Sequence, residues 1–374
     1  MKNSIVPVGG ININQFTSRN VIPWWRWIFS KSPECSALTF FFLSRKNSTS
    51  PRFFPLFNEM KSLQIVLVRG TRWGKLDYFQ LKGVNLFEKI TRRKQSSYNW
   101  LLTSKYMTES KFGLNVALNL DDPLYTETEI KNIITWEKKI INESRRSVII
   151  VTSETTKSYL NESDVKSPIF VIEQGFTNNS LALPDKNKNF SLVYSSPYID
   201  TKNDKHGNHP TWGADLFIKE IIPKIIKADN SIEIHLVGRV GKEASRYLRE
   251  HSQVKLHGLV TFLENSEILK KTHVGLYPRN FDNNRRVQKI YEYIGANLPI
   301  VTFDLEDTKP VVQLRVGISV NNVDDFVKAV IKLKNDHNLY TFFYDNILKF
   351  KNDYTWQTLA GRFDQLIFDS FPST

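Results

Sequence analysis

The segment from residue 285 to residue 304 reads RRVQKIYEYIGANLPIVTFD and has two faces at helical spacing. Its apolar residues recur at i, i+3, i+4 and i+7: Val287, Ile290, Tyr291 and Ile294. A second stripe is polar: Arg285, Lys289 and Glu292. Gly295 and Asn297 are residues that end helices, and the following IVTFD reads as a short buried strand. The segment therefore predicts an amphipathic helix followed by a strand.

The same alternation extends through the second half of the chain. Apolar runs predict strands at 191–196, 232–238, 254–258, 274–278, 299–304 and 317–320. Helical patterns separate them at 214–228, 243–251, 265–272 and 323–336, with Pro223 expected to kink the first or to start a second helix. Strands alternating with helices predict a doubly wound parallel sheet over residues 190–350.

The first half gives a weaker pattern of the same kind. Strands are expected at 36–44, 63–70, 147–154 and 167–176, a strand running into a turn at 112–123, and helices at 75–91 and 127–144. The Asn-, Pro- and Lys-rich stretch 177–190 reads as a linker. We therefore expect an α/β protein with two Rossmann-like domains facing a cleft, the first spanning residues 1–180.

Charge and composition narrow the partners. The 374 residues carry 51 Lys and Arg against 38 Asp and Glu, a net charge of +13, which favours nucleotides, nucleic acid or an anionic membrane surface. The basic residues are dispersed and form no nucleic-acid-binding module, so no nucleic-acid partner is expected. The single cysteine excludes a disulfide within the chain and fits a reducing compartment.

Three polar turns are expected at the carboxyl ends of strands in the second domain, where ligands of such sheets bind. They are VGRVG with Gly238 and Arg239, YPRNFDNNRR with Tyr277, Asn284 and Arg285, and YSSPYIDTKNDKHG after residue 193. The helix that follows the second turn presents unpaired N–H groups suited to phosphate. These residues are candidates for binding an anionic ligand. The alternative for Gly238 and Arg239 is an ordinary strand-to-helix turn.

The order of these pieces resembles the donor domain of GT-B glycosyltransferases, especially family 4, or group 1, enzymes of bacterial polysaccharide synthesis. The resemblance rests on IHLVGR, VKLHGLV, THVGLYP, KIYEYIGANLPIV and the late DYTWQTLAGRFDQL, with NLDDPLY, VIIVTSE and VIEQGF in the first half. It covers residues 112 to 365. It implies a nucleotide-sugar-dependent glycosyltransferase of the hexosyltransferase type, with residues 351–374 forming a helix that returns to the first domain.

The resemblance also implies roles for single residues. Glu292 matches the glutamate that holds the ribose hydroxyls, and Lys289 can face the diphosphate. Asn284 stands where the family often has a second glutamate, and Trp212 and Gly213 stand where it has Lys-Gly. The phosphate lysine would then be Lys202, Lys205 or Lys289, and the stereochemical outcome stays open. The alternative for Lys289 and Glu292 is a solvated helix face.

Asp121 and Asp122 follow a predicted strand of the first domain and are the candidate catalytic carboxylates. A carboxylate there can deprotonate an acceptor hydroxyl, as inverting transfer requires, while the alternative is a cap or a turn at Pro123. No cofactor and no metal are expected, and the nucleotide sugar is the substrate. The acceptor is expected to be a glycan or a lipid-linked intermediate.

Other functions remain open at this level. A GT-B nucleotide-sugar epimerase has the same fold, and Asn284 and Trp212 fit a GT-B partner subunit that lost catalysis. The chain shows no secretory signal and no spanning run. The stretch VIPWWRWIFSK at 21–31 suits a membrane interface or core packing equally. We expect a cytoplasmic protein that docks peripherally on the inner face of a membrane.

Overall fold

The computed structural model describes two units, each of which is treated by itself. Unit 1 contains residues 1–173 and 356–374, and unit 2 contains residues 174–355. The described residues are 5–8, 37–43, 63–69, 100–103, 115–120, 127–142, 146–176, 186–201, 213–260, 262–281, 287–355, 358–359, 362 and 365–366. The predicted helix at 75–91 and most of the predicted linker lie outside these ranges.

Unit 1 is built on parallel strands. The five-stranded sheet has the order β1-β4-β5-β6-β7, and β2 pairs with β3 separately. The strands are β1 (Ile5–Val8), β2 (Ala37–Leu43), β3 (Leu63–Arg69), β4 (Trp100–Thr103), β5 (Asn115–Leu120), β6 (Ser147–Val151) and β7 (Ile169–Val171). All their pairings are parallel, as the apolar runs predicted.

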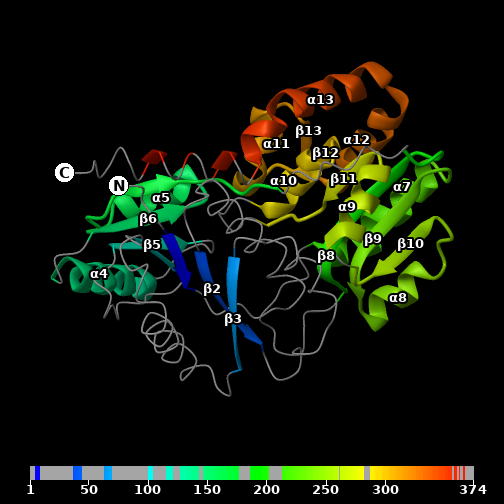
Figure 1. The fold of residues 1–374 in the computed structure, drawn as a ribbon. Helices are drawn as coiled ribbons and strands as arrows, with labels where there is room; N and C mark the ends of the chain where they lie inside the picture. Colours follow the sequence, from blue (N-terminus) through cyan, green and yellow to red (C-terminus); the bar gives the residue numbers. More distant parts are fainter. Residues whose placement is uncertain are drawn as a thin grey trace. The chain divides into compact units, whose positions relative to one another are not determined.

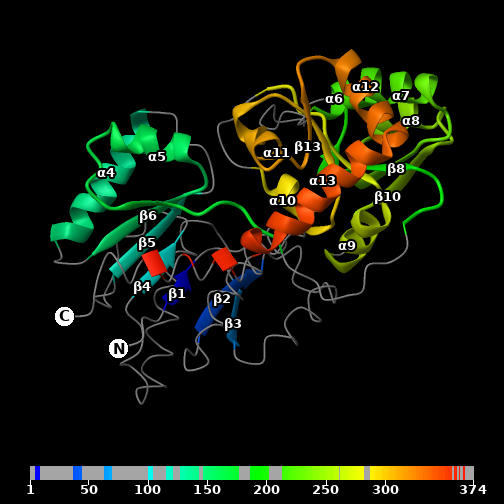
Figure 2. The ribbon, with the colours of Figure 1, turned by 90° about the horizontal axis from the view of Figure 1, so that it is seen from above.

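Two helices of unit 1 lie beside β6 (Figure 2). They are α4 (Glu127–Asn142) and α5 (Glu154–Asn161). Ile133, Trp136 and Ile140 recur at helical spacing along α4 and are buried against Ile149 and Val151 of β6. This contact accounts for the helix predicted at 127–144.

Unit 2 holds a six-stranded parallel sheet in the order β10-β9-β8-β11-β12-β13. The strands are β8 (Ser191–Ile199), β9 (Glu233–Val240), β10 (Val254–Gly258), β11 (Val274–Tyr277), β12 (Ile300–Phe303) and β13 (Gly317–Val320). Numbered from β8, this order is 3-2-1-4-5-6, that of the dinucleotide-binding Rossmann fold. The chain order reverses between β8 and β11, so these two central neighbours form the topological switch point.

Helices cover both faces of the unit 2 sheet (Figure 1). They are α6 (Ala214–Leu216), η3 (Phe217–Ile221), α7 (Ile222–Ala228), α8 (Lys242–Leu248), α9 (Phe262–Lys271), α10 (Gln288–Gly295), η4 (Glu306–Thr308), α11 (Lys309–Gln313), α12 (Val323–Asn335), α13 (His337–Phe350) and η5 (Lys351–Tyr354). Leu192 and Tyr194 of β8 join one apolar core with α7 and α12, whereas Val193 joins the other core with α10. Side chains of a strand alternate between faces, so both faces of β8 are buried.

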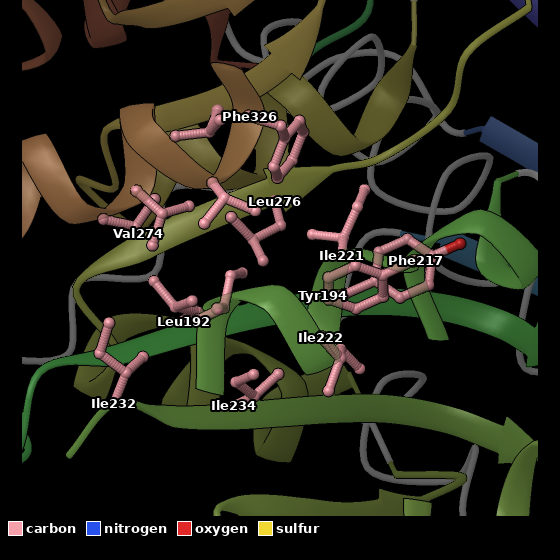
Figure 3. Close-up of a cluster of buried hydrophobic side chains, with 14 of the residues drawn as sticks. Leu192, Tyr194, Phe217, Ile221, Ile222, Ile232, Ile234, Val274, Leu276 and Phe326 are labelled. Atoms are coloured by element: carbon pink, nitrogen blue, oxygen red, sulfur yellow. The ribbon is translucent and has the colours of Figure 1, made fainter. Parts of the chain in front are cut away.

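The first core is made of branched and aromatic side chains from several elements (Figure 3). Leu192 and Tyr194 of β8 lie in this cluster with Val274 and Leu276 of β11. Phe326 of α12 lies beside Leu276, and the Tyr194 ring packs against that of Phe217. The strands predicted at 191–196 and 274–278 are therefore observed at the buried centre of one sheet.

The predicted helix at 214–228 contains a π-helical turn before Pro223. Residues Phe217–Ile221 form this turn, and the N–H of Ile222 donates to the carbonyl of Phe217, five residues earlier. Proline has no N–H and its ring crowds the carbonyl four residues before it. The wider π-helical turn accommodates Pro223, so the helix continues past the proline instead of ending there.

None of the helices that the structure describes is long and apolar enough to cross a membrane.

Candidate functional site

The switch point of unit 2 places the ends of β8 and β11 next to each other. Ligands of doubly wound sheets bind beyond the carboxyl ends of the strands at such a point. The residues concerned are Tyr194 to Asp200 at the end of β8, Tyr277 to Phe281 after β11, and the first turns of α10. Gly213 lies before α6, and a Cβ there would collide with the carbonyl oxygen of Pro278. The loops that follow β8 and β11 therefore meet.

The α10 helix presents Lys289 to this point. Its ammonium lies 4.7 Å from the centroid of the Tyr194 ring and 5.5 Å from that of Tyr277. Both distances are within the range of cation–π attraction. Burial raises the pKa of Tyr194 to about 12 and also raises the pKa of Tyr277, so both phenols are neutral. Lys289 is half-buried, and its ammonium lies near two uncharged rings, one from β8 and one from β11.

The buried face of α10 follows the predicted stripe. Ile290, Tyr291 and Ile294 are buried, Val287 is half-buried, and Tyr293 is buried as well. Glu292 is half-buried, and its charge helps to raise the pKa of the adjacent Tyr293. Lys289 and Glu292 are thus partly shielded from solvent on α10. Their proposed contacts with a donor remain predictions.

A buried ion pair fixes the start of the loop after β11. Arg279 is 1% exposed and lies 3.0 Å from a carboxylate oxygen of Asp307, which is also buried. The same nitrogen donates to the Tyr277 hydroxyl at 3.1 Å. The guanidinium also lies 4.4 Å from the centroid of the Phe281 ring. A buried charge needs such partners, and here they hold Tyr277 in place.

Arg279 and Asp307 were not among the residues predicted from sequence. Arg279 stands directly after a buried strand, which is the one local signal available. Asp307 lies in the 3-10 turn after β12, far from Arg279 along the chain. Only the adjacency of β11 and β12 brings the two together.

Gly238 has a structural role at the end of β9. Its φ of 144° lies outside the range that other residues adopt readily, and a Cβ would collide with the carbonyl oxygen of Ser196. The close approach follows from an irregularity in β8 between Ser195 and Tyr198. Arg239 is exposed and pairs in register with Tyr198. Its predicted contact with a diphosphate remains untested.

Asp200 already occupies the start of α8. Its carboxylate accepts hydrogen bonds from Ala244 N at 3.1 Å, Thr201 N at 2.8 Å and the Tyr198 hydroxyl at 2.7 Å. A carboxylate at a helix N-terminus satisfies unpaired N–H groups. The start of α8 is therefore capped by the protein itself. Sequence reasoning missed this residue, because the cap comes from a different strand.

Several predicted residues lie outside the described ranges: Asp121, Asp122, Asn284, Arg285, Lys202, Lys205, Trp212 and the segment 21–31. Their roles stay predictions. Within the described residues, no group of three or more His, Cys, Asp or Glu side chains is arranged to hold a metal ion. The expectation of a metal-free, cofactor-free reaction is likewise a prediction.

A family model described as "Glycosyl transferases group 1" matches residues 206–336, which lie within unit 2. No curated protein sequence matches the chain. Solved structures similar to the whole chain are glycosyltransferases. Residues 206–336 therefore resemble group 1 glycosyltransferases, and the whole chain has the GT-B fold.

Three similar structures illustrate the GT-B fold. A glycosyltransferase from Rickettsia africae has a TM-score of 0.67 at 9% identity, covering 100% of both chains. HepE from Anabaena, in complex with UDP and glucose, has a TM-score of 0.66 at 12% identity, covering 99% of this chain and 100% of HepE. S. aureus TarM, in complex with UDP among other ligands, has a TM-score of 0.63 at 11% identity, covering 98% of this chain and 99% of TarM. The predicted α/β GT-B fold is confirmed.

Proposed function

We propose that this GT-B glycosyltransferase moves a sugar from a nucleoside diphosphate sugar to a glycan or lipid-linked acceptor in cell-surface polysaccharide synthesis. The observation that carries the proposal is the position of Lys289, 4.7 Å from the Tyr194 ring of β8 and 5.5 Å from the Tyr277 ring of β11. A cation there lies where this kind of sheet binds its ligand.

The chemistry of transfer needs a cation at such a position. When the glycosidic bond to the donor breaks, the nucleoside diphosphate leaves with growing negative charge. Lys289 neutralises part of that charge, and the N–H groups at the N-terminus of α10 stabilise it further. Arg239 and Arg285 are the further cations proposed for this role, and no metal ion is required.

Glu292 supplies the second part of the donor site. It follows Lys289 by three residues, so both side chains lie close together on α10. A carboxylate accepts hydrogen bonds from two vicinal hydroxyls, which is the arrangement that a ribose offers. Tyr277 lies beside Lys289 and lines the same region. We propose that Glu292 binds the ribose while Lys289 faces the diphosphate.

UDP is the first nucleotide to test. The similar TarM and HepE structures are complexes with UDP. WaaG, a glycosyltransferase involved in lipopolysaccharide biosynthesis, is similar at a TM-score of 0.61 and 10% identity, covering 97% of this chain and 99% of WaaG. These neighbours support a UDP-sugar donor and a glycan acceptor. We further propose docking of the enzyme on the cytoplasmic face of a membrane, where lipid-linked acceptors reside.

The experiment is a turnover assay with a panel of UDP-, GDP- and ADP-sugars, with and without lipid-linked and glycan acceptors. The proposal expects release of nucleoside diphosphate together with a glycosylated acceptor for at least one donor. Binding of a nucleoside diphosphate without turnover would indicate the inactive partner subunit instead. Conversion of one nucleotide sugar into another without release would indicate an epimerase.

A further inference from the structure

The ladder between the two central strands of unit 2 stops early. β8 and β11 pair only at Leu192 with Val274 and at Val193 with Gly275. In a parallel ladder of this register, the next hydrogen bond would run from Ser195 N to the carbonyl oxygen of Leu276. The strands part before that bond forms, at the switch point beyond which sheets of this kind bind their ligands.

The Tyr293 hydroxyl lies between this donor and this acceptor. Ser195 N donates to it at 3.3 Å, and it lies 3.0 Å from the carbonyl oxygen of Leu276 and 3.4 Å from that of Val193. Burial raises the pKa of Tyr293 well above its usual value, so the phenol keeps the proton that it donates. One hydroxyl thus replaces a missing rung of the sheet.

The sequence provides space for the ring at one specific place. Residue 275 is a glycine, and a Cβ built on it would lie 2.5 Å from two ring carbons of Tyr293. Any other residue there would push against the ring. The side chain of Ser195 is held as well, because its hydroxyl donates to Asn265 Oδ1 of α9 at 3.2 Å. Both central strands and α10 therefore meet at this hydroxyl, while α9 holds the Ser195 side chain.

We infer that Tyr293 is a positioning residue that sets where α10 stands over the crevice. Its hydroxyl holds β8 and β11 apart and fixes α10 to both strands. Lys289 lies one turn earlier on the same side of the helix, and Glu292 is the adjacent residue. The inference rests on the proposed donor site, because it assigns Tyr293 to the placement of those two side chains.

Removal of the hydroxyl should therefore act on the ligand and not only on stability. In Tyr293→Phe the two strands can close onto each other or admit water, and either change moves α10. We expect the Kd for UDP to rise about tenfold. In turnover, the KM for the donor should rise while the KM for the acceptor stays unchanged.

Tyr291→Phe is the matched control. Tyr291 lies on the same helix, is fully buried and loses the same atom, but its ring packs 5.1 Å from the Tyr354 ring. We expect its Kd for UDP to stay within twofold of the unchanged protein. Calorimetric titration of UDP and thermal unfolding of all three proteins give the comparison. A second variant, Gly275→Ala, should weaken UDP binding as Tyr293→Phe does, because the added methyl displaces the ring.

The outcomes separate the two proposals. If the unchanged protein binds UDP and Tyr293→Phe binds it equally well, with only a lower unfolding temperature, Tyr293 is merely structural and the inference is wrong. If the unchanged protein binds none of UDP, GDP and ADP, the proposed donor site fails and the inference falls with it. A tenfold loss in Tyr293→Phe with an unaffected Tyr291→Phe supports both.

Discussion

At the scale of single residues, the donor site divides into what spacing predicts and what only the fold reveals. The helix face that carries Lys289 and Glu292 follows from helical periodicity within one short segment, whereas their donor roles come from the resemblance to GT-B enzymes and stay predictions. The ion pair of Arg279 with Asp307 could not be predicted, since it joins loops that follow two different strands. The Asp200 cap of α8 belongs to the same class, as its partner N–H groups start a helix after another strand.

Asp122 carries a prediction of its own at this scale. If it is the base that deprotonates the acceptor hydroxyl, Asp122→Asn should lower kcat by about 10²-fold or more. Binding of the donor should be unchanged, because the amide keeps the size of the carboxylate. Steady-state turnover and UDP titration of the same preparation check both statements. Asp164→Asn, at an exposed aspartate after α5, is the control and should turn over normally. Near-normal turnover in Asp122→Asn would leave Asp122 only a cap or turn role.

At the scale of elements, the strands of unit 2 and their parallel pairing could be predicted because buried parallel strands appear as short apolar runs, whereas their order in the sheet was not predicted. Two described strands of unit 1, β1 and β4, were not predicted, and β1 reads IVPV, with a proline that argues against a strand. The α13 helix was also missed. Its aromatic and polar residues at 337–350 follow α12 after a single Asp, which caps the new helix by accepting from Leu339 N at 2.9 Å.

His273, directly before β11, should make the free energy of unfolding depend on pH. Burial and the charge of Lys186 lower the pKa of His273 to about 4, and Ser191 N donates to its Nδ1 at 3.1 Å, which requires that nitrogen to be unprotonated. Between pH 4 and 6.5 the unfolded chain therefore binds more protons than the folded one. The free energy of unfolding should fall as pH drops through this window, by on the order of 1 kcal/mol at pH 5 after solvent screening.

The substitution His273→Asn tests this element directly. Its side-chain oxygen can still accept from Ser191 N, but it does not titrate. Urea unfolding at pH 7.5 and at pH 5 should then show a smaller loss of stability than in the unchanged protein. His337→Asn, at an exposed histidine of α13, is the control and should lose as much as the unchanged protein. An equal loss in His273→Asn would show that His273 does not carry the effect.

At the scale of the whole molecule, a net charge of +13 suits a protein that handles anionic partners. Binding of a nucleotide accounts for part of the positive charge. We propose that the rest serves to bind an anionic membrane surface. Near such a surface each Lys or Arg contributes about 1 kcal/mol. The enzyme should therefore pellet with anionic vesicles at low salt, less so at moderate salt, and not with neutral vesicles. Failure to pellet with anionic vesicles at low salt would mean that the charge serves the nucleotide alone.

If α10 contributes Lys289 and Glu292 to a nucleotide-sugar site, calorimetric titration should show that UDP binding depends on Glu292. Glu292→Ala removes a carboxylate proposed to accept two ribose hydrogen bonds, each worth about 1.5–3 kcal/mol before compensation. Its Kd for UDP should rise at least tenfold, with an unfolding temperature close to that of the unchanged protein. Glu250→Ala, at an exposed glutamate after α8, should bind UDP normally. A Glu292→Ala protein that binds UDP as tightly as the unchanged one would contradict the account.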